Sequence, residues 1–321
     1  MAKIEILNEK AGQYITPKPL CKGDKVAIVA PATHIRPEYV EGACEYLKRH
    51  GYAPVVSEHC LGNSNDYSGT AEERFLDLSR AFADKEIAAI LCARGGYGAV
   101  HLIERFSPEF LRDNAKWLIG FSDITALHAM MLNAGVKSIH GAMAKYMWEN
   151  PESNIHLDNL MKILGGDTPE DLSWESTALD IRGTAEGILA GGNMAVFNGL
   201  NGSRYDIGNI PGHILFIEDV GERPHAVERM LYNLKLGGVL EQLSGLIIGQ
   251  FTEYEERKQL GKELYGAIAD LVKAYDYPVC FNFPVGHVTQ NMPLLNGAQV
   301  ELNVERKGAT LTMQTNEQSE L

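Results

Sequence analysis

The sequence predicts an α/β protein built from two domains, and two observations lead to this. Through the first half, short apolar runs alternate with amphipathic segments, and strands separated by helices imply a parallel sheet covered on both faces. Residues 166–180 are polar and irregular, as in a linker. We therefore expect a first domain over residues 17–165, a second over 181–315, and a boundary at 166–180.

The elements of the first half follow from spacing and end signals. Residues 36–51 carry apolar side chains at helical spacing and end at a glycine. Thr70 and Glu73 form a capping-box pair at the start of a second helix. Strands are expected over 25–32, 53–57, 88–93, 117–121 and 138–141, and further helices after the glycine turn at 94–98, after Ser122, and over 151–165.

The second half mixes strands and helices, so both α/β and α+β architectures stay open. Residues 185–202 read as a strand, a glycine turn and a short helix. Proline near the start and glycine at the end delimit a helix over 222–238. Strands are expected over 212–219, 243–251 and 277–283, a helix over 261–275 and a hairpin over 298–314.

Composition restricts the partners and the setting. A net charge of −13 argues against a nucleic-acid groove or an anionic membrane surface. The N-terminus lacks a basic start followed by an apolar core, and no apolar run reaches the ~18 residues of a membrane span. Five scattered cysteines without a CxxC pair suggest neither a disulfide framework nor a zinc site. We expect a cytoplasmic protein without a metal or cofactor.

Ser122 lies at an abrupt corner, where the apolar run 117–121 stops and a helical pattern begins. One interpretation is capping, because serine is a favoured first residue of a helix. The other is a nucleophile at a strand-to-helix turn, where unpaired backbone N–H groups can stabilise an oxyanion. The local pattern lacks the second glycine of G-x-S-x-G, so on this pattern alone capping is favoured.

Three further stretches could contribute chemistry. The glycine turn at 94–98 fits no nucleotide-binding pattern, so it is either a plain tight turn or a donor of N–H groups beside Ser122. Glu218 ends an apolar strand and could point into a cleft, whereas Glu222, just before a helix, is best explained as an ordinary dipole partner. His287 lies in a Gly/Pro loop after a strand, whereas His128, inside the helix after Ser122, is expected to pack.

Eight stretches in order resemble the LD-carboxypeptidase family of serine peptidases, which includes the microcin C immunity peptidases. They are GDKVAIVAPA, TAEERFLDL, ARGGYGA, GFSDITALH, AEGILAGGNMAVF, LFIEDVGERPHAVERML, IIGQF and FPVGHVTQNMPLLNG. The similarity as a whole covers about residues 22–314. The resemblance implies a flavodoxin-like first domain and a mixed α/β, barrel-like second domain, with the active site in the cleft between them. It assigns a catalytic triad of Ser122, Glu218 and His287.

The chemistry of acyl transfer suggests roles for other residues. The backbone N–H groups of Asp123 and Gly96 are candidates for the oxyanion hole, with Gly95 as the alternative to Gly96. A substrate carboxylate needs a cation or N–H donors. Arg94, Asn193 and Thr252 lie just after strands and are candidates for substrate binding, although the residue patterns favour a structural role for each.

The resemblance implies hydrolysis of an amide between an L-centre and a terminal D-amino acid, releasing D-alanine from muropeptide tetrapeptides in peptidoglycan recycling. It also implies a homodimer acting on a small-molecule substrate. Two alternatives stay open. One is a microcin-immunity-like peptidase that cleaves aminoacyl-nucleotide conjugates, and the other is a non-catalytic protein that binds muropeptides.

Overall fold

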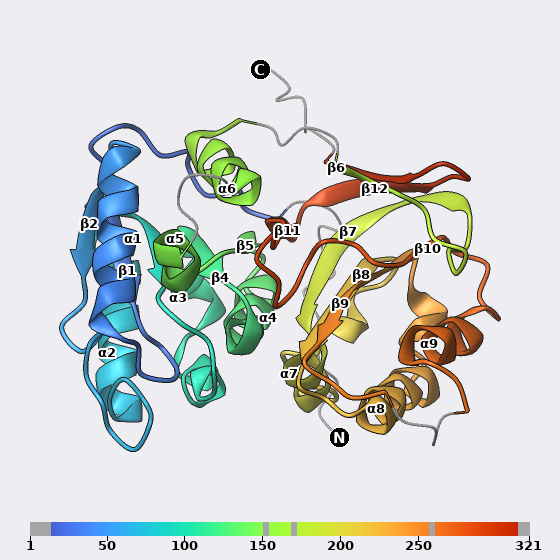
Figure 1. The fold of residues 1–321 in the computed structure, drawn as a ribbon. Helices are drawn as coiled ribbons and strands as arrows, with labels where there is room; N and C mark the ends of the chain where they lie inside the picture. The colour runs from blue at the N-terminus through green and yellow to red at the C-terminus, as the bar shows by residue number, and fades with distance from the viewer. Residues whose placement is uncertain (1–13, 150–153, 168–171, 257–260, 314–321) are drawn as a thin grey trace.

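The computed structural model describes residues 14–149, 154–167, 172–256 and 261–313. Figure 1 shows two halves side by side, each built around its own sheet, with the first half in blue and green and the second in yellow to red. The predicted helix over 151–165 appears as α6 (Ile155–Gly165), and positions 151–153 of that prediction lie outside the described residues. The two-domain α/β class expected from the sequence is confirmed.

The first sheet has the order β11-β5-β4-β3-β1-β2. Its five sequence-consecutive strands pair in parallel in the order 2-1-3-4-5, which is that of flavodoxin-like sheets. All of them were expected: β1 (Lys25–Val29), β2 (Ala53–Val56), β3 (Ile87–Cys92), β4 (Trp117–Gly120) and β5 (Ser138–His140). The loops at their carboxyl ends therefore share one edge, where ligands bind in sheets of this kind.

One helix of the first half begins at the capping-box pair that the sequence predicts. In α2 (Ala71–Ala83), Thr70 Oγ1 accepts the N–H of Glu73 and Glu73 Oε2 accepts the N–H of Thr70, so the capping box is confirmed. The prediction of a single helix directly after the glycine turn is wrong. Gly98, at φ 121°, is followed instead by two 3₁₀ turns. The remaining helices are α1 (Pro37–Arg49), α3 (Pro108–Asp113), α4 (Thr125–Asn133) and α5 (Ala144–Glu149).

The second sheet has the order β10-β9-β8-β7-β12-β13-β6 and mixes parallel with antiparallel pairs. This order does not confirm the barrel-like form that the family resemblance implied. Its strands are β6 (Leu172–Trp174), β7 (Gly183–Asn193), β8 (Ile214–Val220), β9 (Gly245–Thr252), β10 (Val279–Cys280), β12 (Gln299–Val304) and β13 (Ala309–Met313), with helices α7 (Met194–Gly199), α8 (Pro224–Leu236) and α9 (Leu264–Val272).

Two segments of the second half depart from the expected pattern. The glycine turn predicted within 185–202 is absent, because β7 continues through Gly191 and Gly192. A Cβ at Gly191 would lie 1.9 Å from the carbonyl oxygen of Phe216, so only glycine allows β7 and β8 to approach this closely. Strand β6 lies inside the expected linker and pairs with β13, while positions 168–171 lie outside the described residues. The domain boundaries themselves stay a prediction.

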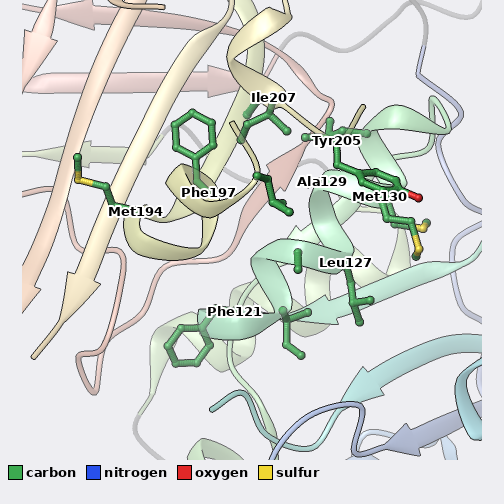
Figure 2. Close-up of a cluster of buried hydrophobic side chains, with 14 of the residues drawn as sticks. Phe121, Leu127, Ala129, Met130, Met194, Phe197, Tyr205 and Ile207 are labelled. Atoms are coloured by element: carbon green, nitrogen blue, oxygen red, sulfur yellow. The ribbon is translucent and has the colours of Figure 1, made fainter. Parts of the chain in front are cut away.

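The two halves share strands and core. Strand β11 (Leu294–Asn296) leaves the second half and pairs antiparallel with β5 at the edge of the first sheet. One buried cluster contains side chains from both halves, including Phe121 and Leu127 with Met194 and Phe197 (Figure 2). Among the described residues, no helix combines the length and the apolar character needed to cross a bilayer. The pairing of β11 with β5 and the shared core hold the two halves against one another.

Candidate active site

Ser122 occupies a strained corner at the carboxyl end of β4. Its φ is +65°, a region that costs a non-glycine residue about 1–3 kcal/mol and that clusters at functional sites. The chain then makes a 3₁₀ turn over Ser122–Ile124 and continues as α4. A Cβ at Gly120 would lie 3.0 Å from the Ile124 side chain, so this glycine lets the turn fold back on the strand. The serine side chain is half-buried rather than lost in the core.

His287 lies in the loop between β10 and β11 and meets both predicted partners. Its Nε2 is 3.1 Å from Ser122 Oγ, and its Nδ1 is 2.8 Å from Glu218 Oε2. The ring also lies edge-on to Phe121, with centroids 4.9 Å apart. The structure therefore brings the three residues of the predicted triad together from two sheets, in the order hydroxyl, imidazole, carboxylate.

Glu218 lies in β8 and is fully buried. The pairing of β8 with β9 shifts register between Ile217 and Asp219, beside Glu218, and such irregularities re-aim side chains near active sites. Its Oε1 has no hydrogen-bond partner among the described residues, and its Oε2 lies 2.8 Å from His287 Nδ1. A buried carboxylate with one dominant partner fixes the orientation of that partner.

The loop that carries His287 is tied to Glu218 by close backbone contact. Gly286 has a φ of +127°, and a Cβ there would lie 2.9 Å from both Cβ and Oε2 of Glu218. The N–H of Gly286 donates to Oδ1 of the buried Asn291 at 2.9 Å. Asn291 was not predicted from the sequence, although its place four residues after the histidine in a Gly/Pro loop was a usable signal.

The glycine turn after β3 lies against Ser122. A Cβ at Gly95 would be 2.8 Å from Ser122 Cβ, and one at Gly96, where φ is +100°, would be 2.1 Å from Thr33 Oγ1. Thr33 holds this turn from the loop after β1: its hydroxyl accepts the N–H of Tyr97 at 3.0 Å, and its N–H donates to the Gly95 carbonyl at 3.3 Å. The backbone of the turn is therefore fixed beside the serine.

Asp123 ties the serine corner to the same turn. Its buried carboxylate accepts the N–H of Ala99 at 2.8 Å. Burial raises the pKa of Asp123 to about 6, against the lowering effect of the Ala99 N–H and of Arg74. Arg74, also buried, donates to the carbonyls of Pro31 and Gly98. Loops after β1, β3 and β4 are thus joined by buried polar contacts.

Two histidines near Ser122 in the sequence do not compete for the role of base. His128 is fully buried between Ser138 Oγ and the Gly120 carbonyl, each 2.8 Å away, and burial lowers its pKa to about 4. His140 is fully buried against Phe121, and burial, with the charges of His128 and His287, lowers its pKa well below the usual range. Both side chains belong to the core, as expected for His128.

The three candidates for substrate binding differ in their surroundings. Arg94 is exposed, and its Nη1 donates to the His34 carbonyl at 2.9 Å. Asn193 is buried, and both ends of its amide are used within the protein, by Asp219 and by the N–H of Val196. Thr252 is half-buried, and its Oγ1 lacks a partner among the described residues. Their contact with substrate stays a prediction.

Comparisons with known proteins agree with this arrangement. Residues 26–141 match the model of the LD-carboxypeptidase N-terminal domain, and residues 186–302 match that of the C-terminal domain. The probable murein peptide carboxypeptidase of Bacillus subtilis is 31% identical over 307 residues, covering 92% of this chain and 93% of the relative. The murein tetrapeptide carboxypeptidase of Pseudomonas aeruginosa is 30% identical over 279 residues, covering 83% and 89%.

Other relatives extend the comparison. The Microcin C7 self-immunity protein MccF of Escherichia coli is 26% identical over 329 residues, covering 92% of this chain and 95% of the relative. The crystal structure of muramoyltetrapeptide carboxypeptidase from Oxalobacter formigenes superposes with a TM-score of 0.82 at 25% identity, covering 91% of this chain and 99% of that one. This chain belongs to the LD-carboxypeptidase family and is a serine-type carboxypeptidase of that family.

Proposed function

We propose that this chain hydrolyses the amide bond between an L-centre and a terminal D-amino acid, releasing D-alanine from muropeptide tetrapeptides. The observation that carries the proposal is the continuous contact from Ser122 Oγ through His287 to Glu218, at 3.1 and 2.8 Å. The names of the relatives from Pseudomonas aeruginosa and Bacillus subtilis support a murein peptide as the substrate class.

In the first half-reaction, His287 Nε2 takes the hydroxyl proton of Ser122 while Oγ attacks the carbonyl carbon. Glu218 accepts the Nδ1–H, which fixes the tautomer and stabilises the imidazolium. The negative charge that develops on the carbonyl oxygen is stabilised by the backbone N–H groups of Gly96 and Asp123. His287 then gives its proton to the departing nitrogen of the D-amino acid, and the tripeptide stays as an ester on Ser122.

In the second half-reaction, His287 Nε2 removes a proton from water, whose oxygen attacks the ester carbonyl. The same N–H groups stabilise the second oxyanion. When the carbonyl re-forms, the proton returns to Ser122 Oγ and the tripeptide leaves with a new carboxylate. The +65° φ of Ser122 supports this role, since it presents the side chain on a sharp strand-to-helix turn, as in a nucleophile elbow.

The family resemblance also supports a cytoplasmic reaction in peptidoglycan recycling, carried out by a homodimer. Fractionation of cells that produce the chain tests the location. Multi-angle light scattering of the purified protein tests the dimer.

A microcin-immunity-like activity is the second candidate, favoured by the 26% identity to MccF across 92% of this chain. A non-catalytic muropeptide-binding protein is the third, and the contacts within the triad argue against it. Parallel assays with a muramyl tetrapeptide and with an aspartyl-adenylate mimic separate them. Cleavage of the second compound alone would favour the immunity-like activity, and binding of tetrapeptide without cleavage would favour the binding protein.

The direct test is mass spectrometry of a muramyl tetrapeptide after incubation with the protein. We expect the loss of one D-alanine from the wild type. Ser122→Ala should fold normally while turnover falls by about 10⁴-fold or more, because the nucleophile is gone. Turnover retained in Ser122→Ala would refute the nucleophile assignment, and an intact tetrapeptide with the wild type would refute the substrate.

A further inference from the structure

Behind the triad, a second polar contact crosses between the two halves. The N–H of Asn193, the last residue of β7, donates to Thr125 Oγ1 at 2.9 Å. Thr125 is the first residue of α4 and is 1% exposed, so this bond is shielded from water. Buried hydrogen bonds in a low-dielectric interior are strong, and their loss leaves a donor unpaired.

The side chain of Asn193 continues this contact toward the catalytic carboxylate. Its Nδ2 donates to Asp219 Oδ1 at 2.9 Å, and the N–H of Ala195 donates to Asp219 Oδ2 at 2.8 Å. Asp219 follows Glu218 directly, and Glu218 is the residue of β8 that pairs with Asn193. We call Thr125, Asn193 and Asp219 the rear chain. It connects α4 to the end of β8 through buried groups only.

The rear chain and the triad are joined at both ends, at the turn from Ser122 to Thr125 and at the neighbouring residues Glu218 and Asp219. Thr125 follows Ser122 through a single 3₁₀ turn, so the two side chains belong to one rigid corner. The N–H of Asn193 in the second sheet contacts Thr125, and His287 contacts Ser122, so both ends of this corner are bonded to the second half. The contact of His287 with Ser122 must change in every turnover, whereas the contact of Thr125 with Asn193 involves no reacting atom.

The backbone approach at the rear crossing is unusually close. A Cβ at Gly192 would lie 2.5 Å from Thr125 Oγ1, so β7 reaches the hydroxyl only because this position is glycine. We propose that Thr125 is a positioning residue: through Asn193 and Asp219, its hydroxyl sets the spacing between Ser122 Oγ and His287 Nε2. This proposal rests on the proposed function for the reaction that it affects.

Other contacts hold the two halves together when the hydrogen bond between Thr125 and Asn193 is removed. Strand β11 pairs with β5 over three residues. Asn296 Oδ1 also accepts the N–H of Gly191 at 3.0 Å, next to the rear crossing. We therefore expect Thr125→Val to keep its fold, with a change confined to the spacing of the catalytic groups.

The test compares Thr125→Val with Thr125→Ser. Valine keeps the branched shape and removes the acceptor, while serine keeps the hydroxyl. Because a small misplacement of reacting groups can cost about 10²-fold, we expect kcat of Thr125→Val to fall by about 10–100-fold with KM nearly unchanged. Thr125→Ser should stay within about threefold of the wild-type kcat. A lower Tm with kcat unchanged would assign Thr125 to stability alone and overturn the proposal.

A second readout does not depend on the substrate. The His287 Nδ1 proton, held between imidazole and Glu218, should give a low-field proton NMR signal that shifts or broadens in Thr125→Val and returns in Thr125→Ser. If the wild type cleaves no tetrapeptide, the proposed function fails, and this signal still decides the role of Thr125. A signal identical in the wild type and Thr125→Val would overturn the proposal.

If Thr125→Val fails to fold, Asp219→Asn tests the rear chain, because it changes the acceptor at the other end of these contacts. In the wild type, N–H groups of Asn193, Ala195 and Val220 donate to the two carboxylate oxygens of Asp219. Asparagine would offer these three donors only one oxygen. We expect the same fall in kcat with KM nearly unchanged and the same change in the His287 signal. A wild-type kcat and an unchanged signal in Asp219→Asn would also overturn the proposal.

Discussion

The Ser122 corner and the His287 loop meet at one point but are fixed by different means. The corner is built from consecutive residues, with a buried strand, a +65° φ and a helix start within six positions. The His287 loop has little regular structure, and distant contacts hold it: Glu218 bonds to the imidazole, and the Phe121 ring packs against the imidazole in a T-shaped arrangement. Local geometry therefore places the nucleophile, while tertiary contacts place the base.

Apart from the loss of Ser122 or His287 itself, the largest effect is expected from removing the charge that orients the base. Glu218→Gln keeps the size of the side chain but cannot stabilise an imidazolium. We expect kcat to fall by about 10³–10⁴-fold with the fold retained, as measured by steady-state hydrolysis and circular dichroism. Glu186→Gln, an exposed change in β7 of the same sheet, is the matched control and should leave kcat unaltered. Near-wild-type turnover in Glu218→Gln would show that the carboxylate of Glu218 is not part of the catalytic triad.

Alanine at two glycines compares the corner with the loop directly. In Gly286→Ala the new Cβ meets Glu218 at 2.9 Å on a backbone with φ +127°, so both kcat and Tm should fall. In Gly95→Ala the new Cβ meets Ser122 at 2.8 Å, so we expect mainly a lower kcat. In each variant we expect kcat to fall by about 10²-fold, because the catalytic groups are displaced.

Gly165→Ala is the control for both glycine variants. Gly165 is the last residue of α6, and a Cβ there would meet no atom within 4 Å. Its kcat and Tm should stay close to those of the wild type, because alanine favours a helix. An effect of Gly286→Ala or Gly95→Ala no larger than that of Gly165→Ala would show that these close approaches do not matter.

The smallest effect concerns the buried carboxylate at the corner. Burial raises the pKa of Asp123 from 3.8 to about 6, so between these pH values the folded state binds more protons than the unfolded state. The free energy of unfolding that Asp123 contributes is therefore greatest below pH ~4 and is lost as pH rises through ~6. Urea unfolding at pH 7 and pH 4 measures this in wild type and Asp123→Asn.

We expect the stability of the wild type relative to Asp123→Asn to increase by about 1–3 kcal/mol between pH 7 and pH 4. The difference between the two proteins removes the contributions of other carboxyl groups. A constant difference across this pH range would mean that the carboxylate of Asp123 is not destabilised by burial.

The contrast between corner and loop also explains what could be read from the sequence. The strand, the abrupt stop at Ser122 and the capping pair of Thr70 and Glu73 are local patterns, and their elements appear where they were predicted. The pairing of β11 with β5 could not be predicted, because it joins segments more than 150 positions apart and carries no local signal. The contact of Thr125 with Asn193, 68 positions apart, likewise carries no local signal.

Asn193 shows a different limit of sequence reasoning. Its place after a buried strand suggested a ligand contact, yet its amide is used by Asp219 and by the start of α7. A polar residue at the carboxyl end of a strand can face a substrate or complete a buried network. Only tertiary contacts distinguish the two. For Ser122, Glu218 and His287, likewise, family resemblance supplied the roles that residue patterns alone left open.

The most direct measurement is a double-mutant cycle on hydrolysis of the muramyl tetrapeptide, using Ser122→Ala, His287→Gln and the double variant. If the hydroxyl and the imidazole act as one unit, each single change should cost about 10⁴-fold or more in kcat, and the double variant should lose no more than either. Losses that multiply in the double variant, or turnover that survives in either single variant, would contradict a shared role for Ser122 and His287.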